Sequence, residues 1–163
     1  MLQESDYDEL LKLIEYREDG HFYHKYDSPR RKAGQRAGYK NANGYIFVCL
    51  GPQKFNAHRV AFYSVYGYLP KCIDHVNGDK TDNRIDNLRA CTHSENQYNK
   101  KIRKDNSSGY KNVIWVKALG KYQVRIRAKG KMHLSGYFYD AKTASYEAKR
   151  MRKKLHGDFA NNG

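Results

Sequence analysis

The sequence predicts an α+β protein built from two small units. Short apolar or aromatic stretches alternate with turns rich in glycine, asparagine and proline, which is typical of antiparallel strands. Other segments carry apolar residues at helical spacing. The excess of basic residues is confined to one part of the chain: residues 100–163 carry 17 basic and 4 acidic residues, whereas residues 1–99 carry 14 and 13. These three observations indicate a near-neutral front unit joined to a strongly basic back unit.

The N-terminal region predicts a helix over residues 5–16. Ser5 or Asp6 is suited to cap its first turn, because a side-chain oxygen there accepts a hydrogen bond from an unpaired backbone N–H. Gly20 ends this segment. The apolar residues that recur on one helical face are Leu10, Leu13 and Ile14.

Short strands and a core helix are expected next. Segment 58–70 holds apolar residues at helical spacing, and the helix stops at Gly67, with Pro70 beyond it. The elements expected before this helix are an aromatic strand at 21–26, a basic loop at 28–38, and two strands at about 44–50 and 54–58.

A polar region then separates two further strands. Strands are predicted at 71–76 and 88–91, and the Asn77-Gly78 dipeptide marks a turn between them. Thr92 or Ser94 is suited to cap a helix that continues to about Arg103. The order is therefore strand, long polar loop, strand and helix.

The segment DNSSG at 105–109 predicts a linker between a domain at 1–104 and a domain at 110–163. The second domain is expected to form a three-stranded antiparallel sheet packed on one helix. Its elements are strands at 110–117, 121–129 and 132–138, and a helix from Asp140 to about His156 that ends at Gly157. In the middle strand, one face is expected to carry Tyr122, Val124, Ile126 and Ala128, and the other Gln123, Arg125, Arg127 and Lys129.

Composition excludes several classes of protein. No stretch approaches the roughly 18 apolar residues of a membrane span, and the start of the chain lacks the pattern of a signal peptide. The three cysteines lie far apart with no CxxC pair, which indicates reduced thiols and no zinc site. A formal net charge of +14 favours a polyanionic partner over a membrane. The alternative interpretation of the charge is a solvated basic surface.

Asp74 and His75 close the strand at 71–76, where both side chains can reach one site. The helix that follows brings Asn96. Carboxylate and amide oxygens suit Mg²⁺, with Mn²⁺ as a substitute, and a neutral histidine suits a general base. The set predicts metal-assisted hydrolysis of a phosphodiester. Asn83 and Asp86 are expected to be turn residues only.

The segment HRVAFYSVYGYLPKCIDHVNGDKTDNRIDNLRACTHSENQYNK resembles the HNH homing endonucleases of phages, which have a ββα-metal (His-Me finger) fold. The resemblance implies that His75 is the general base and that Asn87 ties down the loop and orients the base. It implies that Asp74 and Asn96 hold one divalent ion, with Asn96 standing where many members have histidine. Residues before this segment, including DYDELLKLIEYREDGHFYHK, resemble the front of the same group.

The back half is similar to the Apetala-type (ethylene-response-factor) DNA-binding domain, through SGYKNVIWVK, GKYQVRIRAKGK, GYF and AKTASYEAKRMRKKLHGDFA. In that family the sheet faces the major groove of DNA. Ser135 departs from the usual aliphatic residue before Gly-x-Phe, which leaves the register of the last strand open. The residues expected to contact DNA are Lys111, Trp115, Lys117, Arg125, Arg127, Lys129 and Lys131 in this half, and Arg30, Arg31 and Arg59 in the front half. The alternative role of Trp115 is packing, and that of Arg59 is a structural hydrogen bond.

These residues predict a site-specific endonuclease that cuts double-stranded DNA as a monomer, nicking one strand. The resemblance implies a phage-encoded protein that acts in the cytoplasm of the host cell. The alternative is a non-catalytic DNA-binding regulator whose nuclease domain has decayed, which Asn96 would favour.

Overall fold

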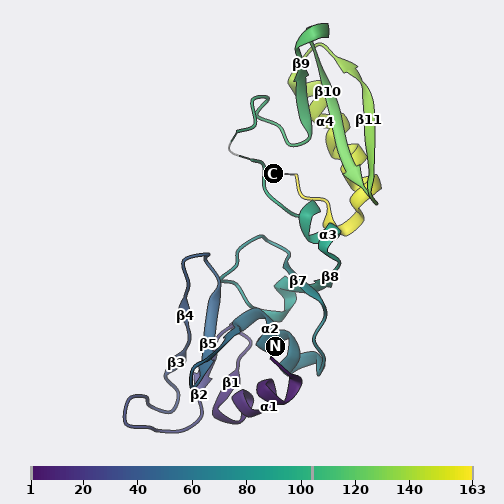
Figure 1. The fold of residues 1–163 in the computed structure, drawn as a ribbon. Coiled ribbons are helices and arrows are strands. Elements are labelled where there is room, and N and C mark those ends of the chain that lie inside the picture. The colour runs from purple at the N-terminus through teal and green to yellow at the C-terminus, as the bar shows by residue number, and fades with distance from the viewer. Residues whose placement is uncertain (1, 104, 163) are drawn as a thin grey trace. The chain divides into compact units, whose positions relative to one another are not determined.

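The computed structural model describes residues 2–103 and 105–162 (Figure 1). The chain is a mixed α/β protein whose small sheets are all antiparallel. It divides into two compact units, an N-terminal unit (Met1–Cys91) and a C-terminal unit (Thr92–Gly163). This division falls ahead of the predicted linker at 105–109, and residue 104, where the first domain was expected to end, lies outside the described residues. In the described part of the chain, no helix is long and apolar enough to cross a membrane.

The N-terminal unit contains three small sheets with two helices. Its sheets have the strand orders β1-β2-β3, β4-β5-β6 and β7-β8. The helices are α1 (Glu4–Leu13) and α2 (Ala57–Tyr66), and the strands are β1 (Ile14–Tyr16), β2 (Phe22–His24), β3 (Arg36–Ala37), β4 (Tyr39–Lys40), β5 (Ile46–Leu50), β6 (Gln53–Asn56), β7 (Cys72–His75) and β8 (Leu88–Cys91). A 3-10 turn, η1 (Ile85–Asn87), leads into β8.

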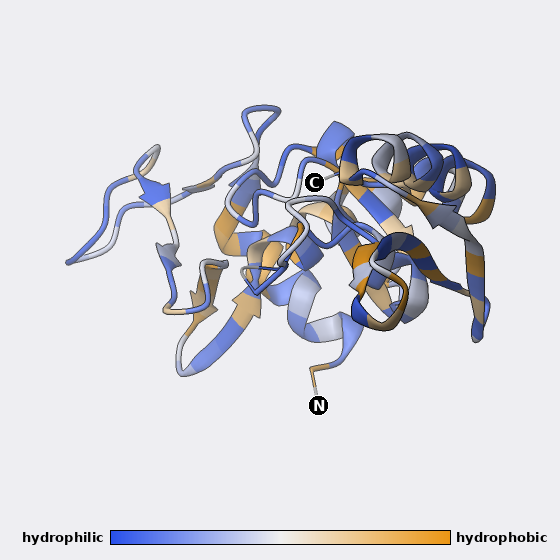
Figure 2. Ribbon diagram, turned by 90° about the horizontal axis from the view of Figure 1, so that it is seen from above, coloured by the Kyte–Doolittle hydropathy of each residue, from blue (hydrophilic) through white to orange (hydrophobic). Residues whose placement is uncertain are grey.

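One hydrophobic core holds this unit together. Leu10 of α1, Ile14 of β1, Phe55 of β6 and Val60 of α2 are at most 2% exposed and pack in it. Burial of such apolar side chains, each worth about 1.5–3 kcal/mol, is the main source of stability in small units of this kind. Figure 2 shows hydrophobic and hydrophilic residues interspersed along the ribbon, as expected of elements that bury one face.

The predicted helix over 5–16 ends three residues earlier than expected. It stops at Leu13 because Ile14–Tyr16 pairs with Phe22–His24 as a strand. The N-cap is Gln3, whose backbone N–H donates to the Asp6 carboxylate at 2.7 Å. The basic loop at 28–38 contains β3, which the sequence pattern did not reveal. Such two-residue strands are held by their neighbours and leave almost no periodicity.

The C-terminal unit is a three-stranded sheet covered on one face by a long helix (Figure 1). The sheet has the order β11-β10-β9. Its strands are β9 (Val113–Val116), β10 (Lys121–Ala128) and β11 (Lys131–Phe138), its helices are α3 (His93–Tyr98) and α4 (Ala141–His156), and its 3-10 turns are η2 (Lys117–Leu119) and η3 (Gly157–Phe159). The core residues are Val113, Val124, Ile126, Ala144 and Ala148.

Several details of this unit differ from the expected pattern. Strand β9 covers only Val113–Val116 of the expected range 110–117. The helix that begins after Thr92 ends at Tyr98 rather than near Arg103. The pairing of β10 with β11 shifts between Gln123 and Arg125, where two residues of β11, including Ser135, lie opposite one residue of β10. This β-bulge is at the position where the sequence departs from the family pattern, and it fixes the register of β11.

Candidate functional site

Asp74 and His75 lie at the end of β7 and are almost fully buried, at 4% and 6% exposure. Strand β7 pairs with β8, and His75 lies opposite Leu88. Polar side chains at such positions must be hydrogen-bonded, because an uncompensated buried polar group costs about 1–3 kcal/mol. The surroundings of each side chain therefore bear on its function.

The loop between β7 and β8 is fastened by Asn87. Its side-chain oxygen accepts a hydrogen bond from the backbone N–H of Asn77 at 2.9 Å. Its amide nitrogen donates to the side-chain oxygen of Asn77 at 3.0 Å and to the carbonyl oxygen of Asp82 at 2.8 Å. The backbone N–H of Val76 donates to the carbonyl oxygen of Asn87 at 2.9 Å. These bonds join the start, middle and end of the loop.

Asn83 is a polar residue of this loop whose importance the sequence did not reveal. Its side chain is 1% exposed, and its oxygen lies 3.1 Å from Nε2 of His75. The expectation that Asn83 is only a turn residue is therefore wrong. Its side chain does more than shape a turn, because it is buried against the predicted base. The signal for it was slight: one asparagine among several in a polar stretch.

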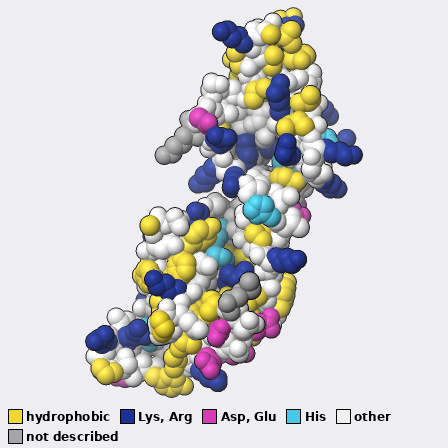
Figure 3. Space-filling view, viewed as in Figure 1, with side chains coloured by type: hydrophobic (Ala, Val, Ile, Leu, Met, Phe, Trp, Pro, Cys, Tyr) yellow, Lys and Arg dark blue, Asp and Glu magenta, His cyan; other side chains and the backbone are white. Residues whose placement is uncertain are grey.

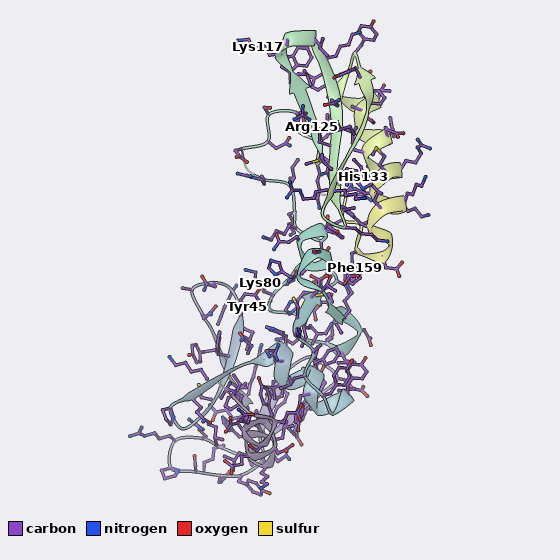
Figure 4. The ribbon with its side chains drawn as sticks, turned by 45° about the vertical axis from the view of Figure 1, so that its right-hand side comes forward. Tyr45, Lys80, Lys117, Arg125, His133 and Phe159 are labelled. Carbon is purple, nitrogen blue, oxygen red and sulfur yellow. The ribbon has the colours of Figure 1, made fainter. Side chains whose placement is uncertain are left out.

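Two rings lie close to the imidazole of His75. The ring centroid of His58 lies 5.2 Å away and that of Tyr45 lies 6.2 Å away. Lys80 holds its ammonium 4.5 Å above the Tyr45 ring, and both residues are labelled in Figure 4. Burial lowers the pKa of His75, against smaller raising effects from Asn83 and Asp74. The imidazole is consequently neutral near pH 7, as a general base must be.

His58 is a second buried histidine beside His75. Burial, with a smaller effect from the neighbouring His75, lowers the pKa of His58 to about 3. A neutral His58 adds no positive charge next to His75. His58 is thus a packing partner of the predicted base.

Asp74 is engaged in an ion pair with Arg89. The Nε and Nη2 atoms of Arg89 donate to Oδ2 of Asp74 at 3.0 and 2.8 Å. The two residues are directly opposite on β7 and β8. A guanidinium orients the carboxylate and neutralises part of its charge. No local pattern marks Arg89 as this partner, because cross-strand partners depend on register.

Asn96, the second expected metal ligand, lies on α3. This helix is fastened to the C-terminal unit through Tyr98: its ring stacks on His156 at 3.8 Å, and its hydroxyl accepts from the backbone N–H of Lys129 at 3.0 Å. Within residues 2–103 and 105–162, no group of three or more His, Cys, Asp or Glu side chains could hold a metal ion. The expected metal ligands are one carboxylate and one amide, which do not form such a group. A metal site made by Asp74 and Asn96 therefore remains a prediction.

The C-terminal sheet presents Arg125 and Arg127 on the face opposite α4. Directly paired residues of antiparallel strands share a face. Arg125 pairs with Leu134 and Arg127 with Met132, and these four side chains are exposed. Figure 4 shows Arg125 on this sheet, and Figure 3 shows Lys and Arg side chains spread over the C-terminal unit. We call these four residues the arginine face.

The other predicted DNA contacts of this unit are placed differently. Trp115 pairs with Tyr122 and lies on the α4 side, with its ring 4.7 Å from that of Tyr122. Lys131 pairs with Ala128 and is also on the α4 side. Lys129 lies in the turn after β10 with a φ of 49°, and Lys117 begins η2 at the end of the sheet. None of these four joins the arginine face.

Lys111 also departs from its expected role. Its ammonium donates to the carbonyl oxygens of Tyr98, at 3.0 Å, and of Lys100. Burial, with a smaller effect from Arg152, lowers the pKa of Lys111 to about 8. Lys111 therefore ties the segment after α3 to the sheet. Because its ammonium already donates to these carbonyl oxygens, its bonds do not favour the expected contact with DNA.

In the N-terminal unit, the three arginines expected at DNA differ in their surroundings. Arg59 donates from Nη1 to the carbonyl oxygen of Pro70 at 3.2 Å, which is the structural role weighed for it. Arg30 and Arg31 are exposed in the loop between β2 and β3. Of the three, Arg30 and Arg31 are therefore the ones whose guanidinium groups are exposed.

Comparison with known proteins adds two findings. A family model described as HNH endonuclease matches residues 55–98, a range that contains β7, β8, α3 and the four residues Asp74, His75, Asn87 and Asn96. Protein 3.8 of Escherichia phage T7 is 34% identical over 107 residues, which cover 63% of this chain and 86% of the phage protein. No solved structure matches the chain significantly.

Proposed function

The chain belongs to the family of protein 3.8 of Escherichia phage T7 and contains an HNH endonuclease domain, and on this premise we propose that it is a site-specific DNA endonuclease of the homing type that nicks one strand. The observation that carries the proposal is His75, buried at the end of β7 with its Nε2 3.1 Å from the side-chain oxygen of Asn83, inside the range matched by the family model.

In the hydrolytic step, His75 takes a proton from the water that attacks the scissile phosphorus. Neutrality of the imidazole, which burial favours, keeps a lone pair for that proton. Asn87 contributes by holding the loop beside His75 in one conformation. Positioning of this kind is worth a large share of the rate, since a misplaced base loses its alignment with the water.

The donor set suits a divalent ion with a preference for oxygen, and Asp74 and Asn96 are the residues that would hold it. We propose Mg²⁺, with Mn²⁺ as a substitute and without zinc, because the donors are an acid and an amide rather than thiolates. When bound, the ion stabilises the negative charge of the phosphate and of the departing 3′ oxygen. Arg89 already pairs with Asp74 and would share that carboxylate with the ion.

The arginine face of the C-terminal unit is the proposed reader of DNA, in the manner of an Apetala-type domain. Arginine forks suit guanine edges in the major groove, and Met132 and Leu134 beside them offer apolar contact to thymine methyl groups. The net charge of +13 over residues 100–163 supplies non-specific affinity. With about six phosphate contacts, affinity should fall roughly a thousandfold between about 50 and 200 mM salt.

We further propose that the protein acts as a monomer on double-stranded DNA in the cytoplasm of a phage-infected cell. The phage relative supports this setting. One HNH domain supports a single cut. The competing proposal is a DNA-binding regulator with a decayed nuclease domain, and the Arg89–Asp74 ion pair favours it, because it partly neutralises an expected metal ligand.

The deciding experiment incubates the purified chain with supercoiled plasmids carrying fragments of its source genome, with Mg²⁺ or with a chelator. We expect metal-dependent nicking that is lost in His75→Ala and retained in His21→Ala, a control histidine of the same unit whose backbone N–H bonds to Asp19. Retarded migration of the DNA without cutting, under all metal conditions, would establish the regulator instead.

A further inference from the structure

Asn83 is buried within a loop that is otherwise largely exposed. It is 1% exposed and among the largest fully buried side chains, whereas residues 76–80 on the same loop are exposed. Burying a primary amide is unfavourable unless its donors and acceptor are satisfied. The loop therefore directs this amide to a defined partner, and that partner is His75.

The orientation of the Asn83 amide specifies which nitrogen of His75 carries the proton. The amide nitrogen of Asn83 lies 3.4 Å from the carbonyl oxygen of Thr81, an atom that only accepts. This contact turns the amide oxygen toward Nε2 of His75, at 3.1 Å. Because a carbonyl oxygen only accepts, Nε2 must donate, and in a neutral imidazole the lone pair then lies on Nδ1.

The backbone of Asn83 is held from the N-terminal hairpin. The hydroxyl of Tyr16 donates to the carbonyl oxygen of Asn83 at 3.0 Å. Gly20 lies against the peptide that joins Asn83 to Arg84, so closely that a Cβ on Gly20 would be 2.6 Å from the Arg84 nitrogen. A chain of contacts thus runs from β1 and its turn, through Asn83, to His75.

The two ring neighbours of His75 do not distinguish its two nitrogens in this way. The rings of His58 and Tyr45 pack around the imidazole and restrict its plane. Ring packing of this kind is insensitive to which nitrogen is protonated. The hydrogen bond from Nε2 is sensitive to it, because the opposite tautomer would place a lone pair against the lone pairs of the amide oxygen.

We propose that Asn83 is a positioning residue that fixes His75 as the Nε2–H tautomer, so that Nδ1 is the nitrogen that accepts the proton of the attacking water. The inference rests on the proposed function for the identity of the base. Asn83 acts through His75 and has no contact with the reacting atoms in this scheme. Its role is distinct from that of Asn87, which fastens the loop.

The test compares Asn83→Leu, which keeps the size and removes the acceptor, with Asn83→Asp, which keeps an oxygen at that position. The full chain is labelled with ¹⁵N-histidine, and long-range ¹H–¹⁵N spectra at a pH where imidazoles are neutral report the tautomer of each ring. A His75→Gln spectrum assigns the signals. We expect Nε2–H in the wild type and in Asn83→Asp, and a mixture or the Nδ1–H form in Asn83→Leu.

Cleavage supplies the second readout. We expect Asn83→Leu to lower kcat by about 10- to 100-fold with little change in KM for DNA, as for other residues that orient a catalytic group, and Asn83→Asp to recover most of the loss. The control is Asn106→Leu, at an asparagine whose amide donates to the carbonyl oxygen of Tyr110 in the C-terminal unit. If Asn83→Leu does not fold, Asn83→Ser replaces it with the same expectation, because the shorter side chain withdraws the acceptor.

An Nε2–H tautomer that persists in Asn83→Leu would overturn the inference, and so would an unchanged kcat. The spectra keep this test separate from that of the proposed function. If the wild type cuts no DNA but Asn83→Leu changes the tautomer, the positioning contact stands and the endonuclease proposal fails.

Discussion

Replacing Gly20 by alanine should destabilise the N-terminal unit and displace the loop that holds Asn83. Gly20 has a φ of 83°, in the left-handed region that favours glycine. A Cβ at this position would lie 2.6 Å from the backbone nitrogen of Arg84 and 3.0 Å from the carbonyl carbon of Asn83. Both are backbone atoms, so no side-chain rotation relieves the contact.

The magnitude follows from two costs. A non-glycine residue in the left-handed region costs about 1–2 kcal/mol. Overpacking that shifts backbone costs about 1–3 kcal/mol. The free energy of unfolding should therefore fall by about 2–5 kcal/mol, which is a large part of the stability of a small unit.

The assay is urea unfolding of the full chain followed by far-ultraviolet circular dichroism. Gly34→Ala is the matched control: its φ is 77°, but no atom lies within 4 Å of the added Cβ. It should show only the conformational cost, about 1–2 kcal/mol. Trp115, the single tryptophan and a residue of the C-terminal unit, reports by fluorescence whether that unit stays folded.

Equal losses in Gly20→Ala and Gly34→Ala would refute the reasoning, because the contact with Arg84 would then have no energetic effect. A second check is the activity of Gly20→Ala at low temperature, where the unit remains folded. We expect a reduced kcat there, since a displaced Asn83 no longer holds His75.

Three further outcomes are expected. Arg152→Met should lower the free energy of unfolding, measured through the fluorescence of Trp115, by about 2–4 kcal/mol, because the 2% exposed guanidinium donates to the Lys111 carbonyl at 2.7 Å and its loss leaves buried acceptors unpaired. The pKa of His58 is lowered to about 3, so below about pH 6.5 the unfolded chain binds a proton that the folded chain does not. The free energy of unfolding should therefore be at its full value above that pH and fall by about 1.4 kcal/mol per pH unit on acidification. Unfolding titrations at several pH values should show a less steep fall in His58→Gln. Arg125→Ala should weaken DNA binding by about 5- to 150-fold in fluorescence anisotropy, corresponding to about 1–3 kcal/mol for a base contact, while cutting persists at high enzyme concentration; loss of all cutting would contradict the assigned division of roles.

The sequence was sufficient for the elements that carry strong local signals. Helix α2 ends at Gly67, strands β7 and β8 flank a polar loop, and α4 ends at Gly157, as periodicity and capping residues predict. The HNH endonuclease domain is confirmed by the family model over residues 55–98. The Apetala-like assignment of the back half and the metal ligands stay predictions.

The sequence was insufficient where one side chain depends on a distant one. Trp115 and Lys131 alternate correctly within their strands, but only the pairing of β10 with both neighbours shows that they share the face covered by α4. Lys111 is a basic residue of the type that contacts DNA, yet its ammonium donates to the carbonyl oxygens of Tyr98 and Lys100. Single-strand periodicity gives two faces and does not say which of them a helix covers.

The sequence by itself determined which functional groups are present: an acidic residue beside a histidine at a strand end, two asparagines downstream, and a basic back half. The tertiary structure alone decided which of these side chains contact each other and which are exposed. It buried Asn83 against His75, placed Arg89 on Asp74, and left Arg125 and Arg127 together on one open face. The physical reason is that the residue types are local properties of the chain, whereas burial and hydrogen-bond partners arise from contacts between segments distant in sequence, which no local pattern records.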